Sequence, residues 1–259
     1  MKRAMPRRTA GSGLWKFGRF ALGMVAVLAA SLAYCWVRLP DVRTLRTRNP
    51  GTTAFMALRA REAAHAGKPW RPDWRWVSYA RISPELKRAV VLAEDAAFWT
   101  HEGVDVDELR ISIEDSLRRG VAPRGASTIT QQLAKNLYLS PSYNPLRKLV
   151  ELMIARRLEA ELSKVRIFEI YLNVVEWGDG IWGAEAAARR YFRTSAASLS
   201  AEEAALLAGA LINPRVYSPA RPNARLLNRQ RIILGRMGVG PRQTLPADDL
   251  TLTEPLDPE

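Results

Sequence analysis

The chain has 259 residues, of which 47% are hydrophobic and 25% charged, a balance that excludes a mainly disordered protein. The formal net charge is +13, and the excess persists when the basic residues 1–37 and the acidic residues 241–259 are set aside. The folded part should therefore favour anionic partners such as nucleic acid, acidic membrane or phosphate-bearing substrates. Because Cys35 is the sole cysteine, an internal disulfide is excluded.

Residues 20–37 form an uncharged apolar run behind a basic amino terminus, residues 1–19. The run is at the lower length limit for crossing a bilayer, about 20 residues, and the preceding positive charge favours a cytoplasmic amino terminus. We predict one transmembrane anchor here. A cleaved signal peptide is the alternative, because Ser31 and Ala33 are small residues at cleavage spacing. Both interpretations export the rest of the chain, which leaves lipid phosphates rather than nucleic acid as anionic partners.

The remaining chain divides into three parts. Residues 38–82 are punctuated by proline and glycine and are predicted to form a linker or stalk. Residues 83–240 are rich in Ala, Leu, Glu and Arg, and no segment alternates with period two. We therefore predict a single all-α domain there. Residues 241–259, acidic and proline-rich, are predicted to form a tail.

The first stretch with candidate chemistry is a helix predicted to begin at Ser83, an N-cap residue followed by Pro84. Its apolar side chains form one stripe, and Glu94 lies on the edge of that stripe. Burial there should raise the pKa of Glu94, as a general acid or base working near neutral pH requires. His101 is placed to hydrogen-bond Asp95 or Glu94. The simpler alternative is an ion pair between Glu94 and a Lys or Arg.

The second stretch runs from Arg124 to Asn136. If Ser127 caps a helix, one narrow arc presents a hydroxyl group, two amides and an ammonium group, carried by Thr128, Gln131, Gln132 and Lys135. These groups suit sugar hydroxyls and phosphate oxygens. The alternative interpretation is an ordinary solvated polar face.

Two further stretches are weak signals on their own. Arg147 and Glu151 are four residues apart on a predicted helix, the spacing of an exposed pair that contributes a few tenths of a kcal/mol. Residues 161–173, followed by a glycine-rich joint, are typical of a core helix and a turn.

In this order, these four stretches resemble the conserved blocks of the peptidoglycan glycosyltransferases of family 51, and residues 199–219 resemble a fifth block. The resemblance covers most of residues 83–219. It implies a helical, partly lysozyme-like fold with a cleft that faces the membrane. It also implies a reaction in which the 4-hydroxyl of an acceptor GlcNAc attacks C1 of a donor MurNAc with inversion, expelling undecaprenyl pyrophosphate.

The resemblance further implies roles for individual residues. Glu94 aligns with the catalytic base, and Glu151 with a second essential glutamate on the donor side, near the pyrophosphate or a divalent cation such as Mg²⁺ or Mn²⁺. The expected substrate-binding residues are Asp95, Phe98, His101, Ser127, Thr128, Gln131, Gln132, Lys135, Asn136, Arg147 and Lys148. A pyrophosphate leaving group accumulates negative charge that fixed Lys and Arg side chains stabilise.

Other functions remain as alternatives. A muramidase or lytic transglycosylase would use Glu94 as an acid, and a membrane-tethered scaffold would have lost its chemistry. No Ser-x-x-Lys or Lys-Thr-Gly motif occurs, so we predict no transpeptidase module, and two histidines with one cysteine exclude a structural zinc site. The expected partners are lipid II, the growing glycan strand, the bilayer and other cell-wall synthesis or division proteins. The expected location is the inner membrane, single-pass, with the catalytic domain on the periplasmic side.

Overall fold

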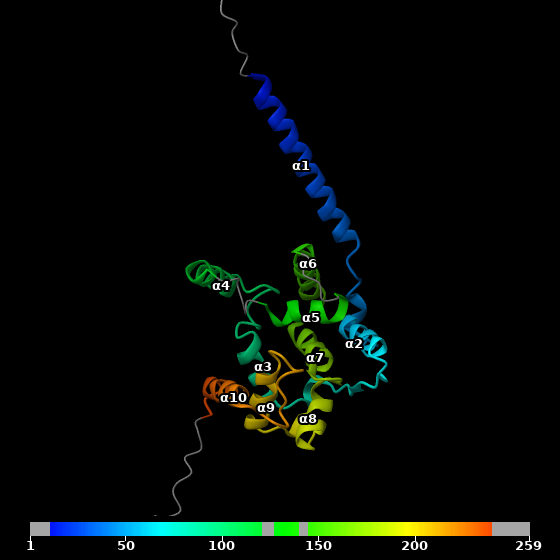
Figure 1. The fold of residues 1–259 in the computed structure, drawn as a ribbon, viewed down its shortest axis with the longest axis vertical. Coiled ribbons are helices and arrows are strands. Elements are labelled where there is room, and N and C mark those ends of the chain that lie inside the picture. The colour runs from blue at the N-terminus through cyan, green and yellow to red at the C-terminus, as the bar shows by residue number, and fades with distance from the viewer. Residues whose placement is uncertain (1–10, 121–126, 140–144, 240–259) are drawn as a thin grey trace, which may run out of the picture.

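The computed structural model describes residues 11–120, 127–139 and 145–239. The predicted acidic tail, the first ten residues and the Arg124–Ala126 part of the second stretch lie outside these ranges. The described chain is mostly helical (Figure 1), which confirms the predicted helical character of the domain. The helices are α1 (Gly11–Val37), α2 (Ala54–His65), α3 (Pro84–Glu94), α4 (Val106–Arg119), α5 (Ile129–Tyr138), α6 (Pro145–Glu161), α7 (Lys164–Val174), α8 (Ala184–Phe192), α9 (Ala201–Ala210) and α10 (Ala224–Arg236), with 3-10 turns η1 (Arg43–Arg46), η2 (Tyr79–Arg81) and η3 (Ala196–Ser198).

A small three-stranded sheet accompanies the helices, and it is too small to change the predicted all-α class. It has the order β1-β3-β2, built from β1 (Asp73–Trp74), β2 (Glu176–Gly178) and β3 (Ile181–Trp182). β1 pairs with β3 in parallel, and β2 pairs with β3 antiparallel. Strands of two or three residues are too short to show the alternation by which a strand is recognised in a sequence.

Residues 38–82, predicted to be a linker, pack against the helical domain. Leu39, Val42, Leu45 and Val77 belong to the same hydrophobic core as the later helices. The buried Asn173 of α7 ties this segment in place, because its Oδ1 accepts from the Val77 N–H at 2.9 Å and its Nδ2 donates to the Val77 carbonyl at 2.9 Å. The segment is therefore part of the domain's packing.

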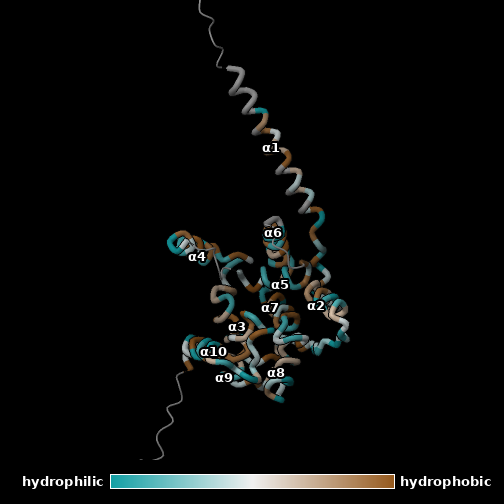
Figure 2. The backbone as a smooth tube through the Cα atoms, viewed as in Figure 1, coloured by the Kyte–Doolittle hydropathy of each residue, from teal (hydrophilic) through white to brown (hydrophobic). Residues whose placement is uncertain are grey.

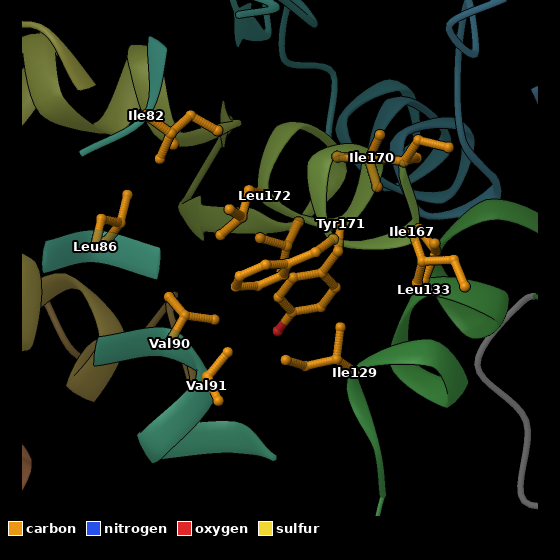
Figure 3. Packing of buried hydrophobic residues seen from close by; sticks show 14 of the residues in the cluster. Ile82, Leu86, Val90, Val91, Ile129, Leu133, Ile167, Ile170, Tyr171 and Leu172 are labelled. Atoms are coloured by element: carbon orange, nitrogen blue, oxygen red, sulfur yellow. The ribbon is translucent and has the colours of Figure 1, made fainter. Parts of the chain in front are cut away.

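The core joins two groups of helices. α3 packs against α9 and α10, while α5 packs against α6 and α7. Figure 3 shows Leu86, Val90 and Val91 of α3 facing Tyr171 of α7 across the core. The carboxyl end of α3 and the amino end of α5 consequently lie next to each other at the edge of the hydrophobic core. The candidate site lies at this junction.

Helix α1 leads away from the domain body (Figure 1) and contains the predicted anchor, residues 20–37. Across the described part of the chain, however, no helix combines the length and apolarity that crossing a membrane requires. The predicted transmembrane helix is thus not confirmed.

Helix α4 stands apart from the body and has no buried residue. Its apolar side chains are exposed to solvent, and Figure 2 shows hydrophobic positions along the helix. The exposed apolar residues are Val106, Leu109, Ile111, Ile113 and Leu117. An unpartnered apolar surface of this kind is typical of a contact with lipid or another molecule.

Candidate active site

Glu94 is the last residue of α3 and lies on the wall of an open cavity of about 490 Å³. The predicted start of this helix is confirmed, since Ser83 accepts a hydrogen bond from the Leu86 N–H and Pro84 follows at the first helical position. The cavity runs from the carboxyl end of α3 to the starts of α4 and α5. Its lining residues are Leu92, Ala93, Glu94, Asp95, Ala96, Ala97, Asp105, Glu108, Ser127, Thr128 and Arg236.

The carboxylate of Glu94 is held by a neutral group, and it forms no ion pair with any Lys or Arg within residues 11–120, 127–139 and 145–239. Gln132 Nε2 donates to Glu94 Oε2 at 2.9 Å. The Gln132 amide is held in turn by the Tyr171 hydroxyl, which donates to Gln132 Oε1 at 3.0 Å. The alternative that Glu94 only forms an interior ion pair is therefore wrong.

Burial raises the pKa of Glu94, as its position on the apolar edge predicted. The hydrogen bond from Gln132 and the positive charges of Arg229 and Lys135 act in the opposite direction, while the neighbouring Asp95 adds to the increase. Desolvation is the largest effect. A carboxylate with a raised pKa that opens onto a cavity is suited to accept a proton.

Asp95 and His101 form a buried pair beside Glu94. His101 Nε2 lies 3.0 Å from both carboxylate oxygens of Asp95, and the Ile129 N–H donates to Asp95 Oδ2 at 2.9 Å. The Gly103 N–H donates to His101 Nδ1 at 3.0 Å, so Nδ1 acts as an acceptor and Nε2 is the ring nitrogen that donates to Asp95. The predicted contact of His101 with Asp95 is confirmed, and it ties the loop after α3 to the start of α5.

Phe98, expected at the substrate site, is fully buried and does not line the cavity. Its ring packs against Phe168 of α7 at 5.3 Å between centroids, and against Trp99 at 4.9 Å. The ammonium group of Lys164 lies 4.5 Å from the ring centre. Phe98 therefore anchors the loop after α3 to α7.

The amino end of α5 is capped by Thr128, not by Ser127 as the sequence had suggested. Thr128 Oγ1 accepts from the Gln131 N–H at 3.2 Å and donates to the Gly103 carbonyl at 2.8 Å. The cap shifts by one residue because Thr128 reaches both α5 and the loop after α3. Ser127 then lies just outside the helix, on the cavity wall.

Lys148 joins the starts of α5 and α6. Its Nζ donates to Ser127 Oγ at 3.2 Å, to Gln131 Oε1 at 3.1 Å and to Glu151 Oε1. Arg147 Nη1 donates to Glu151 Oε2 at 3.5 Å. Glu151 is only 3% exposed, so this is a partly desolvated cluster rather than the exposed pair that the spacing alone suggested.

Lys135 of α5 is within electrostatic reach of both Glu94 and Glu151. Burial lowers its pKa, the charges of Glu151 and Glu94 act to raise it, and Lys148 and Arg147 lower it further. The Lys135 ammonium makes no hydrogen bond to any residue that the structure describes, and it lies 5.9 Å from the centre of the Phe55 ring. Lys135 is thus a largely buried cation whose pKa responds to the charges of both glutamates.

Asn136 serves the helix backbone, because its Nδ2 donates to the Gln132 carbonyl at 2.8 Å. Sequence reasoning missed Arg236, which lines the cavity and donates to the Leu92 carbonyl at 3.0 Å, and Arg229, which acts on Glu94 from the same helix. Their spacing of seven on one face of α10 was the available signal. Tyr171 was also missed, because a tyrosine in a core helix carries no sign of a polar contact.

A divalent cation held by protein side chains does not fit this site. In the described ranges, no three or more His, Cys, Asp or Glu side chains are placed to hold a metal ion. Both oxygens of Glu151 already accept hydrogen bonds from cationic side chains. The cationic groups bound to Glu151 are the side chains of Lys148 and Arg147.

A family model described as Transglycosylase matches residues 64–238. Curated relatives named biosynthetic peptidoglycan transglycosylase extend the similarity. The protein from Laribacter hongkongensis is 47% identical over 216 residues, covering 83% of this chain and 94% of the relative. That from Chromobacterium violaceum is 46% identical over 215 residues, with 83% and 94% covered, and that from Methylobacillus flagellatus is 50% identical over 193 residues, with 73% and 82% covered. The chain therefore belongs to the transglycosylase family, as the resemblance of its conserved blocks predicted.

Proposed function

We propose that this protein polymerises peptidoglycan glycan strands from lipid II, with Glu94 as the general base. Glu94 removes the proton from the 4-hydroxyl of an acceptor GlcNAc, whose oxygen forms a bond to C1 of the donor MurNAc. The bond from C1 to the pyrophosphate breaks with inversion, and undecaprenyl pyrophosphate leaves with the electron pair. The names of the curated relatives support this activity, and none of them supports a glycan-cleaving one.

The proposal rests on the surroundings of the Glu94 carboxylate. Its carboxylate opens onto a cavity of about 490 Å³ and is held by the Gln132 amide. Burial raises its pKa. A base with a pKa closer to neutrality accepts a proton from a hydroxyl more readily than an exposed carboxylate, which ionises near pH 4.3.

The donor side is assigned to the cations of α5 and α6. Lys135 is desolvated and within electrostatic reach of both Glu94 and Glu151, while Lys148 and Arg147 are held by Glu151. Fixed positive charges stabilise the charge that develops on a departing pyrophosphate. Glu151 then acts by holding these cations in place.

Glu94→Gln tests the role of the base. The variant keeps an acceptor for the Gln132 amide but cannot take up the proton, so polymerisation of lipid II in detergent should fall by about 10²- to 10⁴-fold. Glu102→Gln is the control, because Glu102 is highly exposed and its contact with Arg156 is 3.6 Å. Near-normal activity of Glu94→Gln, or cleavage of finished sacculi without polymerisation, would overturn the proposal.

We further propose that the protein works at the inner membrane, with its catalytic domain on the extracytoplasmic side and α1 as the segment that enters the bilayer. Exposed apolar side chains on α1, such as Leu22, Met24 and Val27, and the apolar side chains of α4 support this location. The lipid tail of the substrate requires access from a bilayer. Membrane fractionation with protease digestion of intact spheroplasts tests it, and recovery in the soluble fraction would contradict it.

A further inference from the structure

Tyr171 of α7 is fully buried and does not line the cavity, yet it is linked to the catalytic base. Figure 3 shows its ring in the core, with the oxygen directed toward Val91 and Ile129. The hydroxyl donates to Gln132 Oε1 at 3.0 Å, and Gln132 is its hydrogen-bond partner among the described residues. A buried phenol that ends on this amide is a candidate for controlling how the amide is oriented.

The hydrogen-bond pattern fixes the orientation of the amide. With Oε1 accepting from Tyr171, the Gln132 nitrogen must face the other way, where it donates to Glu94 Oε2 at 2.9 Å and, more weakly, to the Ser127 carbonyl at 3.4 Å. Every donor then meets an acceptor.

The reversed amide is disfavoured at both ends. Its oxygen would face the Glu94 carboxylate, which is repulsive while Glu94 is ionised. At the other end, the Tyr171 hydroxyl would accept from the amide nitrogen, and its own hydrogen would have no acceptor in a fully buried position. Without the hydroxyl, the second penalty disappears, and the reversed amide is excluded only by the charge on Glu94.

We propose that Tyr171 is a positioning residue for the transglycosylation reaction: its hydroxyl locks the Gln132 amide with nitrogen toward Glu94, and so keeps the base ionised and oriented. This inference rests on the proposed role of Glu94. Tyr171 does not line the cavity and reaches Glu94 through Gln132. Glu94 Oε1 has no hydrogen-bond partner among the described residues, so this oxygen is left for the incoming proton.

Other charged groups also act on Glu94, and they stay in place when the hydroxyl is removed. These groups are Asp95 at the end of α3, Lys135 on α5 and Arg229 on α10. The cavity that Glu94 lines adds Asp105, Glu108 and Arg236. None of these six side chains is hydrogen-bonded to the Tyr171 hydroxyl, whose partner is Gln132, so Tyr171→Phe changes the amide without changing the charges.

The first test is the dependence of the polymerisation rate on pH. In Tyr171→Phe, the acidic limb of the profile should move to higher pH by about 0.5 to 1 unit, because a weakened hydrogen bond to a charged group stabilises the carboxylate less. The rate on the plateau above the limb should change less than about threefold. Tyr191→Phe is the matched control, since it loses a phenol hydrogen bond of 3.3 Å to the Trp177 carbonyl and should leave the limb unmoved.

The second test needs no catalysis. Tyr171→Phe raises the pKa of Glu94 in the folded protein only, so the ionised carboxylate costs more stability above that pKa and nothing below the unfolded value. The loss in melting temperature should be larger at pH 8 than at pH 4, and in a Glu94→Gln background it should be the same at both.

An unshifted acidic limb with an equal drop in rate at every pH would overturn the inference, as would a melting-temperature loss that ignores pH in the presence of Glu94. Either result leaves the proposed function standing so long as Glu94→Gln is inactive. If Glu94→Gln polymerises normally, the proposed function fails, and the melting experiment still reports on the Tyr171–Gln132–Glu94 chain.

Discussion

Replacement of Asp95 distinguishes a residue that holds the loop from one that takes part in the reaction. Asp95→Ala removes the acceptor of the Ile129 N–H and of His101 Nε2–H. Both donors are in a site where the Asp95 side chain is 2% exposed, so water replaces the lost partner poorly. Each unsatisfied buried donor costs about 1–3 kcal/mol.

We therefore expect Asp95→Ala to lower the free energy of unfolding by about 3 kcal/mol, which corresponds to about 6–12 °C in melting temperature for a domain of this size. Asp95→Asn keeps an oxygen for one donor but turns an NH₂ group toward the other, so about half of that loss is expected. Differential scanning calorimetry gives the melting temperatures. The control is Asp115→Asn, which breaks an exposed pair with Arg119 on α4 and should change little.

Activity decides between the two roles. If Asp95 positions the loop, Asp95→Asn assayed well below its melting temperature should polymerise lipid II within about tenfold of the wild type, a smaller loss than a missing general base causes. A variant that melts like the wild type but is more than about a hundredfold slower would refute this reasoning and make Asp95 a catalytic residue.

Three other predictions follow from the same contacts. Burial raises the pKa of Glu94, so the ionised carboxylate destabilises the fold above that pKa. Glu94→Gln should therefore have a higher melting temperature than the wild type at pH 8 and the same melting temperature at pH 4. An equal increase in melting temperature at both pH values would contradict this. Lys148→Ala leaves Arg147 as the cation paired with Glu151. It should lower the free energy of unfolding in urea by about 1–2 kcal/mol, less than the loss of a fully buried pair, because Lys148 is half exposed. An unchanged urea midpoint would show that the contacts of Lys148 do not stabilise the fold. Gly183→Ala should cost at least about 2 kcal/mol, since Gly183 has φ +81° and the new carbon would lie 2.8 Å from a backbone oxygen; wild-type yield and melting temperature would disprove this.

Much of the helical architecture follows from local signals. Ser83 with Pro84, and the apolar stripe that ends at Glu94, predict α3 and the environment of its carboxylate, because both depend on residues within one helix. The cap of α5 was displaced by one residue since Thr128 bonds the Gly103 carbonyl, a contact from outside the helix. The sheet was missed because β1 pairs with a strand more than a hundred positions later.

The candidate site also combines residues that the sequence predicts with contacts that only the packing of helices creates. Gln132 and Lys135 lie in a stretch whose residue types point to sugar and phosphate chemistry, and Glu94 lies in one that points to acid–base chemistry. Lys148 was expected at the site only from the family resemblance. What each side chain does depends on helix packing: Tyr171 reaches Gln132 only because α7 packs against α5. The charge on Arg229 reaches Glu94 because α10 packs against α3. Such contacts leave no periodic trace within either helix.

The parallel pairing of β1 with β3 also imposes an order on biosynthesis. Val42, Leu45 and Val77 are made early, but the residues that cover them belong to helices made later, and Trp74 donates to the carbonyl of Asn173 at 2.8 Å. The amino-terminal third of the domain must therefore wait, partly unpacked, until translation has passed Trp182. Contacts this distant in sequence slow folding, so protection from aggregation matters most for the segment that leaves the ribosome first.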